Sequence, residues 1–142
     1  MAANGNLRAS VNEALIALPA LQVSDFERNL MAVGYLTAVF EAEGIRPIIV
    51  GGHAIETYTQ GFYTTKDVDL VLRGRADALD ILRELGFQQY HDLRHWYFPQ
   101  LRLPIEIVDS DLAGSEERLL RVQLPNNLHI YVIGIEGVSI MT

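Results

Sequence analysis

Three acidic residues stand where neighbouring strands of a sheet would bring them together. Asp67 and Asp69 are two apart at the start of an otherwise apolar run, and Glu106 has an isoleucine on each side. Residues two apart in a strand project to the same face, so the two aspartates point together. Like charges about 4 Å apart repel by about 4 kcal/mol at an effective dielectric constant of 20. The cluster therefore predicts a bound cation, and Mg²⁺ (or Mn²⁺) is the kind of ion that carboxylates and substrate phosphates hold together.

A glycine pair precedes these acids and suits a phosphate. Gly51 and Gly52 follow the apolar run 47–50, which indicates a buried strand, and precede one or two expected helical turns over 53–59. Glycine lets the backbone approach a ligand closely, and a helix N-terminus offers free N–H groups to phosphate oxygens. His53 and Lys66 are further candidates for contact with phosphate. Their alternatives are helix capping or solvent exposure for His53 and a solvated lysine beside two acids for Lys66.

A second segment interleaves aromatic rings with cations. Between residues 91 and 102 the chain places His91, Arg94, His95, Trp96, Tyr97, Phe98 and Arg102. Such a mixture can stack bases and contact phosphates, although strand alternation with Trp96 and Phe98 facing inward also explains it. His91 and His95 would suit a metal only on a helix, and this segment does not have a helical pattern. His129 lies in a predicted strand and gives no signal of its own.

The elements that must position these residues form an α+β domain. Apolar periodicity predicts helices over 7–18, 26–42 and 75–85, with Ser24 and Glu27 as a capping box before the second. Strands are predicted over 47–50, 67–72, 87–90, 94–98, 103–108, 119–124 and 128–133. We expect a mixed β-sheet with helices packed mainly on one face. Residues 1–45 would supply N-terminal helices that pack on a core formed by residues 46–142, in a single domain overall.

Composition narrows the function classes. The chain has 142 residues, a net charge of −7 and no cysteine, which excludes disulfides and thiolate chemistry. No apolar run approaches the roughly 18–20 residues that span a bilayer, and the amino terminus lacks the layout of a secretory signal, so a cytoplasmic protein without a membrane partner is expected. The acidic total disfavours a large nucleic acid as the partner. The apolar end at 140–142 suggests that a longer natural protein has been cut here or that this end packs on something.

The run Ile48–Gly52, followed by Thr65–Leu70 and Ile105–Ile107, resembles the nucleotidyltransferase superfamily related to DNA polymerase beta. The signature of that family is an apolar strand, Gly-Gly or Gly-Ser, a gap, Asp-x-Asp and a later strand acid. The resemblance covers residues 46–109, and small bacterial and archaeal members, including toxin–antitoxin-associated ones, are the most similar in pattern. It implies a nucleotidyltransferase-like fold and transfer of a nucleoside monophosphate from an NTP to an acceptor hydroxyl, with release of pyrophosphate.

The same resemblance implies roles for the acids. Asp67 and Asp69 would be Mg²⁺ ligands, and Glu106 would match the third acid, which helps to bind the catalytic metal and to activate the acceptor hydroxyl. Asp109 and Asp111 lie close to Glu106 in sequence, and Glu106 is preferred because its apolar neighbours place it in the middle of a strand. The gap 53–66 is at or beyond the long end of the usual range.

Two alternative functions remain beside the enzyme. One is a catalytically silent relative that acts as a binding protein, such as a component of a toxin–antitoxin pair. The other is a plain interaction domain whose strand acids are solvated. For the enzyme, the acceptor stays open between a small molecule, a tRNA end and a protein hydroxyl. A homodimer would supply the wall of the acceptor site that a short chain lacks.

Overall fold

The computed structural model describes residues 2–50, 68–73, 78–108 and 119–133, which form one seven-stranded sheet and the helices on it. The strands are β1 (Arg46–Val50), β2 (Val68–Arg73), β3 (Gln88–Gln89), β4 (His95–Phe98), β5 (Leu103–Ile107), β6 (Leu119–Gln123) and β7 (His129–Ile133). Their order across the sheet is β3-β4-β5-β2-β1-β7-β6. The pairs β1–β7 and β2–β5 are parallel and the other four pairs are antiparallel, so the sheet is mixed, as the sequence predicts.

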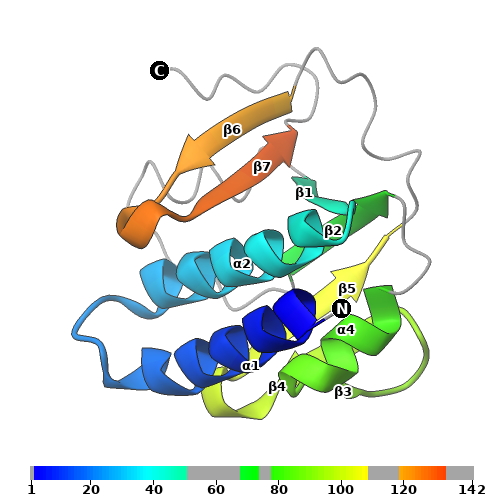
Figure 1. Cartoon of the computed structure of the whole chain (residues 1–142), viewed down its shortest axis with the longest axis horizontal. Helices are drawn as coiled ribbons and strands as arrows, with labels where there is room; N and C mark the ends of the chain where they lie inside the picture. The colour runs from blue at the N-terminus through cyan, green and yellow to red at the C-terminus, as the bar shows by residue number, and fades with distance from the viewer. Residues whose placement is uncertain (1, 51–67, 74–77, 109–118, 134–142) are drawn as a thin grey trace.

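The helices α1 (Ala2–Ala17), α2 (Asp25–Ala42) and α4 (Ala78–Leu85) lie side by side over one face of this sheet (Figure 1). The predicted capping box opens α2, since the backbone N–H of Glu27 donates to the hydroxyl of Ser24 at 3.1 Å. A 3₁₀ turn over Leu18–Ala20 connects α1 to the segment before α2. Helices on one face of a mixed sheet are the α+β arrangement expected from the sequence.

Strand alternation divides the sheet into two faces with different partners. Every second strand residue points toward the helices and packs in the main core with α1, α2 and α4. These residues include Ile49, Leu70, Leu72, Trp96, Phe98, Leu103, Ile105, Ile130 and Val132. The intervening residues point to the face turned away from these helices, here called the far face. A smaller buried cluster of Ile48, Val71, Tyr131 and Ile133 lies there. Two polar residues of this face, Asp69 on β2 and Glu106 on β5, are among the predicted site residues.

The predicted elements match the observed ones except at their ends. The first helix begins at Ala2 rather than at residue 7, and β3 covers only Gln88–Gln89 of the strand predicted over 87–90. β3 is short because the backbone N–H of Phe87 still bonds to the last turn of α4, at Leu82 O (3.0 Å). Gly86 follows α4 with φ +104°, a left-handed conformation that favours glycine, and a Cβ there would make a tight contact of 3.1 Å with Phe98 Cε1. The helical turns expected over 53–59 lie outside the described residues.

A carboxylate at the end of α2 is bonded to the start of β7. The Tyr131 hydroxyl donates to Glu41 Oε2 at 2.6 Å, and His129 Nε2 lies 2.7 Å from Glu41 Oε1. The guanidinium of Arg121, which can only donate, lies 3.1 Å from His129 Nδ1, so Nδ1 accepts and Nε2 carries the proton. Arg46 lies over the Tyr131 ring, 4.7 Å from its centroid. His129, which has no signal in the sequence, therefore helps to join helix and sheet.

We predict that Tyr131→Phe lowers the free energy of unfolding by about 1.5–3 kcal/mol at neutral pH, because it removes a hydrogen bond to a carboxylate. Burial raises the pKa of the Tyr131 phenol above its usual value near 10, and the bond to Glu41 raises it further. The stabilisation by the protonated Tyr131 phenol is fully present below pH 10. It is lost as the pH rises through the raised pKa of this phenol. Urea denaturation at pH 7 to 11 should show a shallower alkaline loss in Tyr131→Phe than in the wild type. Tyr35→Phe is the control. An equal loss of unfolding free energy per pH unit in Tyr131→Phe and the wild type would contradict this account.

Candidate functional site

Asp69 and Glu106 are directly opposite each other on the two neighbouring parallel strands β2 and β5. The register pairs Val68 with Ile105 and Asp69 with Glu106. Such strands run about 4.8 Å apart, and register partners in a sheet project to the same face. Because Leu70 and Ile105 are fully buried on the helix side, the two carboxylates point to the far face. The fold thus brings together two of the three predicted acids.

The other predicted site residues lie outside the described residues. These are Asp67, Gly51, Gly52, His53 and Lys66, together with the alternative acids Asp109 and Asp111. The described part of β1 still bears on the glycine pair. β1 pairs with β2 in an antiparallel register that matches Ile49 with Leu70, so Val50, its last residue, comes opposite Asp69. The strand end from which the chain continues into Gly-Gly is therefore beside Asp69.

Glu106 is held by an arginine that precedes β4. Arg94 Nη2 donates to Glu106 Oε2 at 3.2 Å, and the Arg94 Nε donates to the carbonyl of Ile107 at 3.3 Å. The side chains of Arg94 and Glu106 are 55% and 28% exposed. Ion pairs at this level of exposure contribute only about 0.2–1 kcal/mol, because water screens both charges. Arg94 therefore neutralises the Glu106 carboxylate without competing strongly against a divalent cation.

His95 continues the same row onto the next strand. It is the register partner of Glu106 in the antiparallel β4–β5 pair, with its Nε2 3.9 Å from Glu106 Oε1. On its other side, Nδ1 lies 2.8 Å from Asp92 Oδ1. Asp92 Oδ1 also accepts from the backbone N–H of Arg94 at 2.9 Å, and the bond to His95 followed by this backbone bond lowers the pKa of the Asp92 carboxyl. Asp69, Glu106 and His95 thus stand on three consecutive strands at one level of the far face.

The sequence interpretation placed Arg94 and His95 in the aromatic segment and missed them as neighbours of Glu106. The hairpin formed by β4 and β5 is the feature from which Arg94 and His95 could have been predicted as neighbours of Glu106. Once the turn is known to occupy Pro99–Leu101 and Arg102, antiparallel counting pairs Phe98 with Leu103 and therefore His95 with Glu106. Arg102 closes this turn in a left-handed conformation, with φ 52°. An arginine does not predict this conformation from sequence, because non-glycine residues rarely adopt it.

The donor set partly fits a hard divalent ion. Carboxylate oxygens are the ligands that Mg²⁺ and Mn²⁺ prefer, and Asp69 and Glu106 supply two such groups on one face. Within the described ranges, no three His, Asp or Glu side chains are grouped so that they could hold a metal ion. A complete ligand set at this position therefore needs a donor from beyond those ranges, as the sequence expectation for Asp67 requires.

Comparisons of the chain with protein-family models, with curated proteins and with solved structures find no match. The resemblance to nucleotidyltransferases therefore stays a prediction from the sequence. In the part of the chain that the structure describes, no helix has the length and apolar character needed to cross a membrane.

We predict that Asp69→Asn changes the free energy of unfolding by less than about 1 kcal/mol in EDTA, because it keeps the shape of a partly exposed side chain and removes only its charge. Thermal melting in EDTA measures the change. Asp80→Asn is the matched control, since Asp80 is an exposed aspartate on α4 that forms a 3.0 Å pair with Arg83. A loss of more than about 1 kcal/mol in Asp69→Asn would mean instead that the Asp69 carboxylate is needed by the fold.

Proposed function

We propose that this protein is a nucleotidyltransferase that uses Mg²⁺ (or Mn²⁺) to transfer a nucleoside monophosphate from an NTP to an acceptor hydroxyl, with release of pyrophosphate. The observation that carries the proposal is the register of Asp69 with Glu106 on the far face. The end of β1, from which the chain continues into Gly51-Gly52, lies beside Asp69 and supports the same reading. A metal site next to a phosphate-binding turn is the combination that this reaction needs.

Each residue has a role that follows from its chemistry. Asp67 and Asp69 would hold the metal ion, and Glu106 would complete the ligand set and accept the proton of the acceptor hydroxyl. When bound, the ion would neutralise charge on the phosphates and stabilise the developing charge at the reacting phosphorus. Gly51 and Gly52 would hold the triphosphate through backbone N–H groups, with His53 and Lys66 beside them. Arg94 donates a hydrogen bond to the Glu106 carboxylate and would hold it in place until a ligand arrives.

The partners follow from the reaction. The NTP is one substrate, and the acceptor is a small molecule, a tRNA end or a protein with a free hydroxyl. We place the activity in the cytoplasm, where NTPs and Mg²⁺ are available, and we propose that a homodimer supplies the outer wall of the acceptor site.

A second candidate function is a catalytically silent relative that binds a partner, as in a toxin–antitoxin pair. The Arg94–Glu106 ion pair favours this candidate, because an arginine that neutralises the third acid can replace a metal ion instead of yielding to one. The two candidates differ in whether Glu106 takes part in binding a cation and in whether label is transferred.

We predict that the protein transfers label from α-³²P NTPs in the presence of Mg²⁺ when offered an RNA end, an aminoglycoside or a protein substrate. Asp69→Asn and Glu106→Gln should each lower the rate by at least about 100-fold, because each removes a ligand to the metal. Glu13→Gln, an exposed substitution on the outer side of α1, and Asp80→Asn are matched controls that should keep full activity. Mg²⁺-dependent NTP binding without transfer, unchanged by Glu106→Gln, would favour the silent relative.

We predict further that Arg94→Gln binds Mn²⁺ up to about fivefold more tightly than the wild type, because the ion no longer competes with an exposed ion pair. Titration followed by the electron paramagnetic resonance signal of free Mn²⁺ measures this affinity. Arg83→Gln, which removes an exposed arginine of α4, is the control. Equal or weaker Mn²⁺ binding by Arg94→Gln would show that Arg94 does not compete with a cation for Glu106.

A further inference from the structure

The two edge strands of the sheet differ in length and in their protection against pairing with another chain. β3 covers two residues, whereas β6 covers five, as many as β1, β5 and β7 inside the sheet. Edge strands avoid pairing with other chains when they are very short or carry proline and several charges. β6 contains no proline, and Arg121 is its single charged residue. Among the described residues, β6 is therefore the edge at which another strand can be added.

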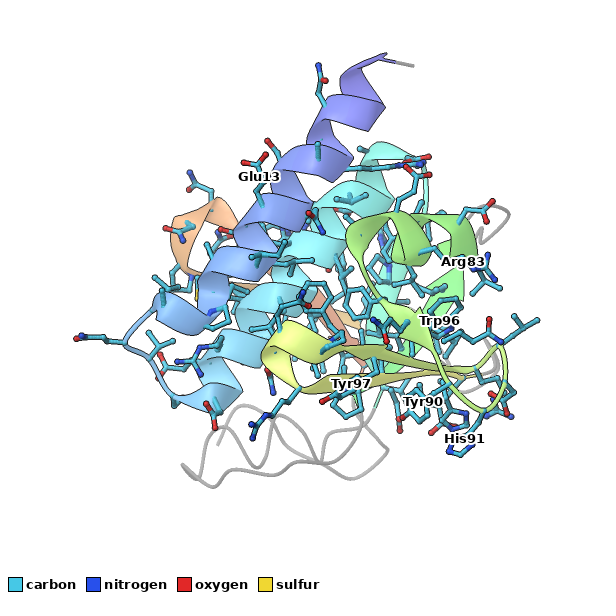
Figure 2. All side chains as sticks on the ribbon, turned by 90° about the horizontal axis from the view of Figure 1, so that it is seen from below. Glu13, Arg83, Tyr90, His91, Trp96 and Tyr97 are labelled. Carbon is cyan, nitrogen blue, oxygen red and sulfur yellow. The ribbon has the colours of Figure 1, made fainter. Side chains whose placement is uncertain are left out.

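β3 is short because the chain turns at both of its ends. Before it, Phe87 still bonds to the last turn of α4. After it, the chain turns back toward β4 through Tyr90 and His91, whose side chains stand at this end of the edge (Figure 2). His91 has φ 67°, which lies outside the range of a strand. The local backbone thus prevents β3 from forming a long pairing edge.

The hydrogen-bond pattern shows which backbone groups of β6 point outward. The N–H of Leu124 donates to the carbonyl of Leu128 at 2.8 Å, so these residues form a hydrogen-bonded pair of the β6–β7 ladder. Such pairs alternate with pairs that do not exchange hydrogen bonds. Val122 therefore bonds to β7 as well, whereas the N–H and C=O groups of Arg121 and Gln123 point away from β7. These outward groups are in position to bond to an added strand.

The helix side of β6 is apolar and only partly covered. Val122 and Leu124 pack at the margin of the main core, and Leu120 is 36% exposed. Figure 1 shows β6 as the outermost strand, with α2 lying along β7 rather than along β6. A strand added beside β6 would cover these three side chains and remove apolar surface from water.

The residues of β6 are complementary to a second copy of themselves. In an antiparallel pair centred on Val122, Leu120 is opposite Leu124 of the second copy, and Arg121 is opposite its Gln123. Apolar residues then meet on the helix side, and a guanidinium meets an amide on the other side. The outward N–H and C=O groups of Arg121 and Gln123 also face each other, in phase to exchange hydrogen bonds.

Other centres for this pairing are less favourable. A pair centred on Arg121 would put two guanidinium groups directly opposite each other, which destabilises a sheet. A pair centred on Leu120 would put Arg121 opposite the apolar first residue of β6. Pro125, which has no N–H to donate, follows β6 and disfavours centres further along the chain. The sequence of β6 thus favours Val122 as the centre.

We propose that β6 is a dimerisation edge, at which two copies of this chain pair their β6 strands antiparallel about Val122 and form one continuous sheet. The two-fold axis of such a pair is perpendicular to the sheet, so the far faces of both copies, with Asp69 and Glu106, lie on the same side. The interface is isologous and closes at the dimer. This inference gives the proposed homodimer a defined surface, and it does not rest on the transferase reaction, because β6 is three strands from β2.

The first test measures the oligomeric state of the whole chain by sedimentation velocity, without NTP or Mg²⁺, between about 1 and 500 µM, where small interfaces dissociate. We expect a monomer–dimer equilibrium. Arg121→Pro should raise the dissociation constant by about tenfold or more, because it removes an outward N–H from both copies and leaves the bonds to β7. Arg121→Ala is the matched control, since it removes the same side chain but keeps the N–H, and it should raise the constant by less than about threefold.

Two changes at Gln123 test the register. Gln123→Lys sets a lysine opposite Arg121 of the second copy and should weaken the dimer by about fivefold or more, although it lowers the net negative charge. Gln123→Glu sets a carboxylate there and should strengthen the dimer by about twofold or more. Leu120→Lys should also weaken it, whereas Leu93→Lys, the same change at an exposed leucine before β4, should not.

Amide hydrogen exchange of the unmodified chain gives a readout that does not depend on the folding of any variant. The amides of Arg121 and Gln123 should exchange more slowly as the protein concentration rises, whereas the amide of Val122, which already bonds to β7, should not change. A monomer at every concentration, larger open-ended oligomers, or a dimer that Arg121→Pro and Leu120→Lys both leave intact would overturn the proposal. Slower exchange at Arg121 and Gln123 only when a foreign extended peptide is added would assign this edge to a different partner and overturn it too. None of these outcomes depends on whether label is transferred from an NTP.

Discussion

The pairing of β2 with β5 is the constraint on which the rest of this structure depends. β2 lies between an antiparallel neighbour and a parallel one, and Leu70 and Ile105 are both fully buried against the helices. Because the side-chain period of a strand is two, a slip of one residue in either strand would turn a carboxylate into that core. A buried, unpaired carboxylate costs far more than the site can contribute. Apolar packing on one face thus determines the distance between Asp69 and Glu106 on the other.

The same alternation divides the far face into two regions with different physical character. Around β1 and β7 it is apolar and buried, with Ile48, Val71 and Tyr131 in one cluster. Toward β5 and β4 it becomes polar and partly exposed, with carboxylates, an arginine and aromatic rings. The buried region stabilises the sheet, whereas the side chains of the second region are only partly buried. The boundary between them is at β2, where Val71 belongs to the first region and Asp69 to the second.

Charge in the exposed region is balanced by weak and separable contacts. Arg94 compensates Glu106, and His95 lies between Asp92 and Glu106. Exposed ion pairs of this kind contribute little to stability, so they can be exchanged for a ligand without unfolding the strands. Glu41 differs from these residues, because two short hydrogen bonds join it to β7. There the carboxylate connects a helix to the sheet, and a ligand would have to break that connection.

The amino-acid sequence by itself determined the elements and their order. The signals for these elements are local: apolar periodicity, the capping residues around Ser24 and the glycine after α4. Each determines structure directly, through the sterics and hydrogen bonding of the nearby backbone. Strand alternation in the sequence also predicted that Asp69 and Glu106 lie in strands and point away from the apolar side. The sequence led us to expect the two acids on neighbouring strands, but the pairing of β2 with β5 and its register are decided by packing between segments more than thirty residues apart. Arg94, Asp92 and His95 join the site only through that pairing and the left-handed turn at Arg102. Tertiary structure decided these contacts because each depends on the summed burial of many side chains rather than on any local pattern.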